Sequence, residues 1–169
     1  FFVQVIECQR VAARKQVAYL PGELRLYENM SGRQLIEFLC GLRGETVNGE
    51  LPELARRFDI DLDRPLRTLS SGMKRKVSLL QVLIQRTPLV IMDEPTAALG
   101  VAEGRQVLDL IRELHRGGTT VVLISHNMAE VVDVATRVAV EPTPMASCMM
   151  LAAVVVSSSI PSSLVTTMD

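Results

Sequence analysis

The chain has 169 residues, with 18 Lys and Arg against 19 Asp and Glu, so its formal net charge is −1. Hydrophobic residues make up 48% and charged residues 22%, a globular composition that excludes an intrinsically disordered chain. This length allows one domain with a real core. The near-neutral charge and the 4% of aromatic residues, without Trp, argue against nucleic acid or an anionic membrane surface as the main partner.

The three cysteines, Cys8, Cys40 and Cys148, lie far apart, and no Cys/His cluster has the spacing of metal ligands. We therefore expect neither a disulfide framework nor a zinc site, but idle thiols in a reducing compartment. The sequence begins at Phe1 without a basic and then apolar leader, which gives no sign of a secretory signal. The missing initial Met suggests that the natural N-terminus lies upstream.

Strand and helix patterns alternate along the first 140 residues. Ser31 is an expected helix N-cap, and Gly117 with Gly118 is an expected helix stop. The apolar run 89–92 is typical of a strand buried on both faces. The alternation predicts an α/β fold with a parallel sheet. The predicted elements are a strand over 16–20, helices over 31–43 and 51–58, a loop over 59–68, a helix over 71–86, a strand over 89–92, a helix over 101–116, a strand over 119–124, a helix over 127–135 and a strand over 137–140.

The composition changes after Glu141, because residues 142–168 contain no charged side chain. The apolar run 149–156 is too short for a membrane-spanning helix, which needs about twenty apolar residues. We expect a poorly ordered extension in which the run 151–156 either adds a marginal strand or adheres to other chains. Deleting residues 142–169 is accordingly expected to leave the fold intact.

Polar side chains follow two of the predicted strands: Asp93 and Glu94 after one, His126 after the other. Ligands of parallel α/β sheets bind beyond the carboxyl ends of the strands. Adjacent acids after an apolar strand are costly unless they hold a cation or a proton. One acid can hold Mg²⁺ through water and the next can take a proton from an attacking water. The alternative is a solvated strand end followed by a turn at Pro95.

A second candidate site lies in residues 69–76, at the start of a predicted helix. Ser70 and Gly72 occupy the helix start, where free N–H groups and the helix dipole attract anions. The three cations at 74–76 oppose that dipole and are tolerable if a phosphate binds there. The alternative is a Ser N-cap followed by a solvated basic turn.

Taken together and in order, these segments resemble the nucleotide-binding domain of ATP-binding cassette (ABC) transporters. The resemblance covers about residues 11–140. The stretches 27–44 and 63–65 resemble ATPases that serve ABC-2 type exporters. The matching motifs are Leu69-Ser70-Ser71-Gly72-Met73 for the signature motif LSGGQ, residues 89–94 for Walker B, 95–100 for the D-loop, 124–126 for the switch histidine and 18–23 for the Q-loop region.

The resemblance implies a partial P-loop NTPase-like fold, in which a parallel sheet core carries a helical subdomain and the N-terminal part is absent. It divides the chain into a partial ATP-binding domain, residues 1–140, and an atypical tail, residues 141–169. Within the domain it implies a helical subdomain at about 24–86 and a part of the catalytic core at about 87–140.

The resemblance also implies the activity and the partners. The parent protein would hydrolyse ATP, with Mg²⁺, at a head-to-tail homo- or heterodimer of ATP-binding subunits, and would energise a separate membrane-spanning subunit. It would lie in the cytoplasm, on the inner face of the cell membrane, and nucleic acid is not an expected partner. Glu94 would be the general base, Asp93 would hold Mg²⁺ through water, and His126 would orient water and the γ-phosphate.

The signature residues Ser70, Ser71, Gly72 and Met73 would bind the ATP held by the partner subunit. Several positions depart from the family pattern, among them Gly22, which stands where the Q-loop Gln is expected. The other replacements are Ser71 for Gly, Met73 for Gln, Gly100 for Asp and Thr136 for Asp.

The chain contains no GxxxxGK[ST] phosphate loop, so the Lys that would hold the β- and γ-phosphates is missing. We therefore expect the isolated chain to be inactive. A non-functional truncated cassette and a non-transport ABC ATPase of translation or DNA repair are the alternatives.

Overall fold

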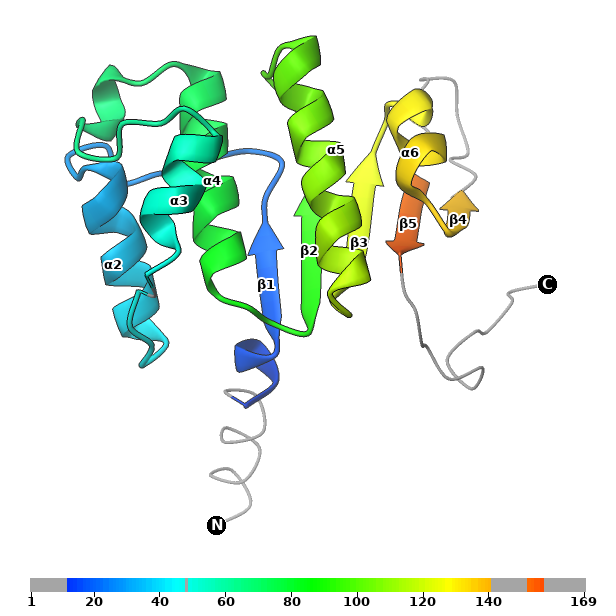
Figure 1. Cartoon of the computed structure of the whole chain (residues 1–169), viewed down its shortest axis with the longest axis horizontal. Helices are drawn as coiled ribbons and strands as arrows, with labels where there is room; N and C mark the ends of the chain where they lie inside the picture. The colour runs from blue at the N-terminus through cyan, green and yellow to red at the C-terminus, as the bar shows by residue number, and fades with distance from the viewer. Residues whose placement is uncertain (1–11, 48, 141–151, 157–169) are drawn as a thin grey trace.

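The computed structural model describes residues 12–47, 49–140 and 152–156. Its sheet has five strands in the order β1-β2-β3-β5-β4 (Figure 1). The pairs β1–β2 and β2–β3 are parallel, which confirms the predicted parallel α/β core. The strands are β1 (Val17–Leu20), β2 (Leu89–Asp93), β3 (Thr120–Ser125), β4 (Arg137–Val140) and β5 (Ala152–Val156).

Strand β5 comes from the uncharged tail and lies between β3 and β4. It pairs antiparallel with both, and the backbone register places Val154 opposite Leu123 on one side and opposite Val138 on the other. Of the two expectations for the run 151–156, the strand is the one that forms. Because β5 separates two other strands, the expectation that the tail can be deleted without harm to the fold no longer follows. Residues 141–151 and 157–169 lie outside the described part of the chain.

The helices begin and end within two residues of the predicted bounds. Their ends are set by local signals: Ser31 Oγ accepts the Gln34 N–H at 3.2 Å in a capping box, and Gly118 follows α5 at φ +88°. The predicted loop 59–68 contains a short 3₁₀ turn, Leu66–Thr68. The helices are α2 (Gly32–Leu42), α3 (Leu51–Arg57), α4 (Ser71–Ile84), α5 (Val101–Arg116) and α6 (Met128–Val134).

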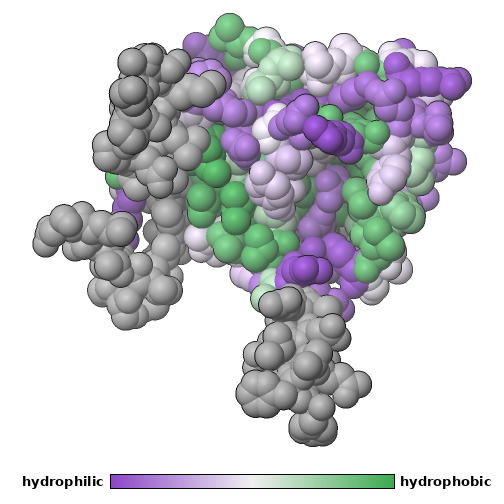
Figure 2. All heavy atoms as spheres, turned by 180° about the vertical axis from the view of Figure 1, so that it is seen from behind, coloured by the Kyte–Doolittle hydropathy of each residue, from purple (hydrophilic) through white to green (hydrophobic). Residues whose placement is uncertain are grey.

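The sheet is covered on one face only within the described residues. Helices α5 and α6 lie in front of it in Figure 1, and the side chains that face the helices, such as Val90 and Val121, are buried. On the opposite face Ile91 and Val122 are half-buried and Tyr19 is 53% exposed. Hydrophobic residues are visible on that side of the molecule (Figure 2). The predicted burial of the 89–92 strand on both faces is therefore wrong for the part of the chain described.

Two features of the fold bear on the site. Strands β1, β2 and β3 run in the same direction, so their carboxyl ends meet at one edge of the sheet. Among the described residues, no helix has both the length and the apolar character needed to cross a membrane.

Candidate functional site

The carboxyl ends of β2 and β3 bring Glu94 and His126 into contact. Register pairs Asp93 with Ile124, and the Glu94 N–H donates to the Ile124 carbonyl at 2.8 Å. The Glu94 Oε1 atom accepts the His126 backbone N–H at 2.8 Å and lies 2.6 Å from His126 Nδ1. The two strand ends therefore lie together in the structure, and their role as one functional site stays a prediction.

The two side chains differ in their exposure to solvent. The Glu94 side chain is 22% exposed, whereas that of His126 is 71% exposed. Both contacts from His126 go to Oε1, and among the described residues no hydrogen bond or ion pair involves Oε2. A carboxylate with one oxygen held and the other free can accept a proton from a water molecule.

Asp93 meets the loop that follows β1. The Gly22 N–H donates to Asp93 Oδ2 at 3.3 Å. A Cβ atom on Gly22 would lie 2.8 Å from the same oxygen, so a side chain at position 22 would push the carboxylate away. Glycine at the Q-loop position is therefore what allows this close approach of backbone to carboxylate.

The donor set around Asp93 fits a magnesium ion held mainly through water. Within the described residues no group of three or more His, Cys, Asp or Glu side chains could enclose a metal. Mg²⁺ is commonly bound by one or two carboxylates together with waters and phosphate oxygens, without a full protein cage. The half-buried Asp93 carboxylate, with one backbone donor on Oδ2, suits that arrangement.

The signature segment, residues 69–73, forms the start of α4. Ser70 is the N-cap, and its Oγ accepts the Met73 N–H at 3.2 Å. Ser70 and Ser71 are exposed, and Gly72 is buried against the backbone of Ala98. No described contact joins this segment to Glu94 or His126. The structure therefore brings the two acids and His126 together and leaves the signature segment apart from them.

The basic residues that follow the signature segment are bound by protein acceptors. Arg75 and Lys76 are only 3% and 7% exposed, and Lys74 forms an ion pair with Glu28 at 2.7 Å. The prediction of a solvated basic turn is therefore wrong. Carbonyl and carboxylate oxygens of the chain bind these cations, and the binding of a phosphate at the start of α4 stays a prediction.

Arg75 is a site residue that sequence reasoning missed. Its guanidinium donates to the carbonyls of Pro21 and Gly22, each at 2.6 Å, and so ties α4 to the loop that contacts Asp93. Burial lowers the pKa of Arg75, while the charges of Asp93 and Glu94 oppose that shift. No sequence signal could have found this role, since its acceptors are backbone carbonyls from a distant segment.

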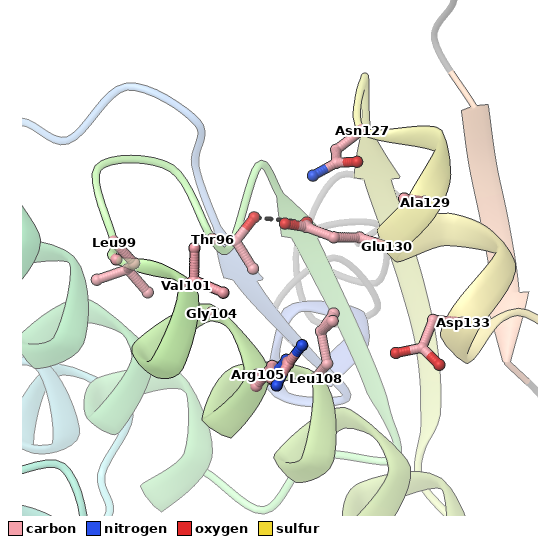
Figure 3. A pocket seen from close by; sticks show the side chains of 11 residues that line it. Thr96, Leu99, Val101, Gly104, Arg105, Leu108, Asn127, Ala129, Glu130 and Asp133 are labelled. Atoms are coloured by element: carbon pink, nitrogen blue, oxygen red, sulfur yellow. Dashed lines mark hydrogen bonds between the residues drawn. The ribbon is translucent and has the colours of Figure 1, made fainter.

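A hollow of about 350 Å³ separates the starts of α5 and α6 (Figure 3). Across it the Thr96 hydroxyl donates to Glu130 Oε2 at 2.6 Å. This hydrogen bond ties the segment that resembles the D-loop, residues 95–100, to α6. It was also missed by sequence reasoning.

Comparisons with known proteins bear on the family of this chain. The family profile described as "ABC transporter" matches residues 4–97. The chain is 42% identical over 92 residues to the fructose import ATP-binding protein FrcA of Rhizobium meliloti, a match that covers 54% of this chain and 35% of that protein. It is 34% identical over 113 residues to the macrolide export ATP-binding/permease protein MacB 1 of Aeromonas hydrophila, covering 66% of this chain and 17% of that protein.

A solved structure described as an ATP-binding subunit of an ABC transporter superposes with a TM-score of 0.69 at 25% identity. The superposition covers 76% of this chain and 56% of that one. The chain belongs to the ABC transporter family and has part of its ATP-binding fold. It spans about a third or less of the length of the two relatives described above.

Proposed function

We propose that this chain is part of an ATP-hydrolysing subunit of an ABC transporter, with Glu94 as the general base. The observation that carries the proposal is the contact of Glu94 Oε1 with both the backbone N–H and Nδ1 of His126. It holds the carboxylate at the carboxyl end of β2, directly after Asp93. Water attack on a phosphorus atom needs such a fixed base.

Each group at the strand ends then has a defined task. Glu94 Oε2 accepts the proton of the attacking water, and His126 keeps Glu94 in position from the neighbouring strand. Asp93 holds Mg²⁺ through water, and the ion, when bound, neutralises charge on the phosphate oxygens. The Gly22 N–H orients the Asp93 carboxylate from the loop after β1.

The signature segment would act on nucleotide bound by a second subunit in a head-to-tail dimer. Support comes from the exposure of Ser70 and Ser71 at the start of α4 and from their separation from Glu94. The hydroxyl of Ser70 and the backbone of Gly72 would donate to the γ-phosphate, with Ser71 and Met73 beside them. A separate membrane-spanning subunit would carry the cargo, which places the assembly on the inner face of the cell membrane.

We propose that the subunit serves export of the ABC-2 type, because residues 27–44 and 63–65 resemble ATPases of that subgroup. Relatives named for import and for export both match the chain, so the direction of transport rests on those two stretches alone. The departures from the family pattern at Gly22, Met73 and Gly100 favour a second candidate, a cassette that no longer hydrolyses ATP.

The test uses a longer protein in which a phosphate-loop segment is joined upstream of residue 1. Glu94→Gln should nearly abolish its ATP turnover while ATP binding persists, because the change removes the base and keeps the size. Glu130→Gln, which alters a carboxylate that contacts Thr96 instead of His126, is the matched control and should retain turnover. If the longer protein hydrolyses ATP equally fast with Glu94 and with Gln at position 94, Glu94 is not the base. If the longer protein with Glu94 does not hydrolyse ATP at all, the inactive cassette is favoured.

A further inference from the structure

Two points of helix α4, one helical turn apart, contact the D-loop segment, residues 95–100, and the start of the helix that follows it. Gly72 lies against the Ala98 carbonyl, where a Cβ would come within 2.8 Å of the oxygen. Four residues further along α4, Lys76 reaches the start of α5 just beyond the D-loop segment. Residues i and i+4 share one face of a helix, so both contacts come from the same side of α4.

Lys76 is a buried cation with two described partners from different elements. Its side chain is 9% exposed, and Nζ lies 2.5 Å from Glu103 Oε1 and donates to the Phe58 carbonyl at 3.2 Å. Phe58 directly follows α3, whereas Glu103 lies in the first turn of α5. One ammonium group therefore joins α3, α4 and α5 at a single point.

Glu103 also binds the end of the D-loop segment. Its Oε2 atom accepts the Gly100 N–H at 3.0 Å, while Oε1 holds Lys76. The Lys76 ammonium, followed by the Gly100 amide, lowers the pKa of Glu103 from its ordinary value. The two oxygens of one carboxylate thus connect a buried cation of α4 with the backbone at which α5 begins.

We infer that Lys76 is a positioning residue that holds the D-loop segment to the signature helix through Glu103. No hydrogen bond joins Lys76 to Gly100 within the described residues, so the effect of Lys76 on that amide passes through the shared carboxylate. Because Gly72 also packs against the Ala98 carbonyl, two contacts hold the signature segment and residues 95–100 in a fixed relative position. The consequence for a nucleotide-driven dimer rests on the proposed function; the linkage itself is a property of the chain alone.

Amide hydrogen exchange of the 169-residue chain, resolved by residue and without nucleotide, tests the linkage. Lys76→Met keeps Glu103, which accepts from the Gly100 amide, but removes the ammonium group that holds Glu103 in place. Exchange of the Gly100 amide should therefore become about tenfold faster, beyond any change in the buried amides of β3. Lys76→Arg should restore slow exchange, because the guanidinium can reach the same carboxylate. If Lys76 only stabilised the fold, the exchange rates of the Gly100 amide and of the β3 amides would change in proportion.

The matched control is Glu113→Gln, which weakens the ion pair between Glu113 and Arg57. That pair also joins α3 to α5, but at the other end of α5, so Gly100 exchange should change only with global stability. Two results would overturn the inference. One is that Lys76→Met speeds exchange of the Gly100 amide only in proportion to the β3 amides. The other is that Glu113→Gln speeds Gly100 exchange as much as Lys76→Met does.

A second variant covers the case in which Lys76→Met does not fold. Glu103→Gln alters a side chain that is 40% exposed and replaces one of its two acceptor oxygens by an NH₂ group. The separate contacts of Oε1 with Lys76 and of Oε2 with Gly100 therefore cannot both be kept. This variant should also speed Gly100 exchange beyond that of β3, and no excess would overturn the inference. These measurements need no ATP, so their failure is distinct from a failure of the Glu94→Gln turnover test.

Discussion

The Ala98 carbonyl oxygen lies 2.8 Å from the position that a Cβ on Gly72 would occupy. Any side chain at position 72 must displace the D-loop segment or the start of α4. Gly72→Ala is expected to lower the free energy of unfolding by about 1–3 kcal/mol, the usual cost of overpacking. Urea denaturation followed by circular dichroism measures this loss.

Gly41→Ala is the matched control for that substitution. Gly41 lies in α2, and a Cβ there would meet nothing within 4 Å. Because Ala favours a helix over Gly, this variant should gain about 0.5–1 kcal/mol. Equal stability changes in the two variants would contradict the close approach at Gly72.

Ala98 itself adopts a left-handed backbone conformation, with φ at +63°. This conformation costs an L-residue roughly 1–2 kcal/mol relative to Gly, so Ala98→Gly should raise the melting temperature. Ala97→Gly, one position earlier and without a positive φ, should lower it. A lower melting temperature for Ala98→Gly would show that the left-handed turn does not form.

Acid should destabilise the fold, since four carboxyl groups bind cations of other segments. Ion pairing lowers the pKa of each of them from ordinary values of 4.5 for Glu and 3.8 for Asp. Groups with a depressed folded-state pKa contribute stability above the unfolded value and lose it as pH falls through the folded value. The four pairs are Glu28 with Lys74, Asp63 with Arg33, Glu103 with Lys76 and Glu113 with Arg57.

Urea midpoints measured from about pH 6 down to about pH 2 should therefore fall mainly below the ordinary carboxyl values near pH 4. Asp63→Asn, which removes the partner of Arg33, should flatten part of that fall. A midpoint that is constant over the whole range would contradict stabilisation by these ion pairs.

The tail strand offers a backbone test. Val154 pairs with Leu123 on one side and with Val138 on the other. Val154→Pro should lower the free energy of unfolding by about 1 kcal/mol or more, because proline cannot donate to a strand ladder. Val165→Pro, in the same tail but outside β5, is the control. Unchanged stability of Val154→Pro would restore the earlier expectation of a dispensable tail.

The sequence by itself determined where helices and strands begin and end, because their signals are local. The Ser31 capping box, the Ser70 N-cap and the glycines after α5 each act within a few residues. It also placed Asp93, Glu94 and His126 at neighbouring strand ends, since parallel strands bring their carboxyl ends to one edge.

Only the tertiary structure decided which partners the buried groups find. Arg75 and Lys76 have the sequence of a solvated basic turn, yet their acceptors come from Gly22 and Glu103, far away along the chain. The sequence of residues 152–156 predicts a strand but not which strands it pairs with. Its position between β3 and β4 depends on the backbone edges of those two strands, which only the folded sheet brings together. Contacts of this kind join distant segments, so no local pattern encodes them; they arise when helices and sheet pack and each buried charge must find an oxygen.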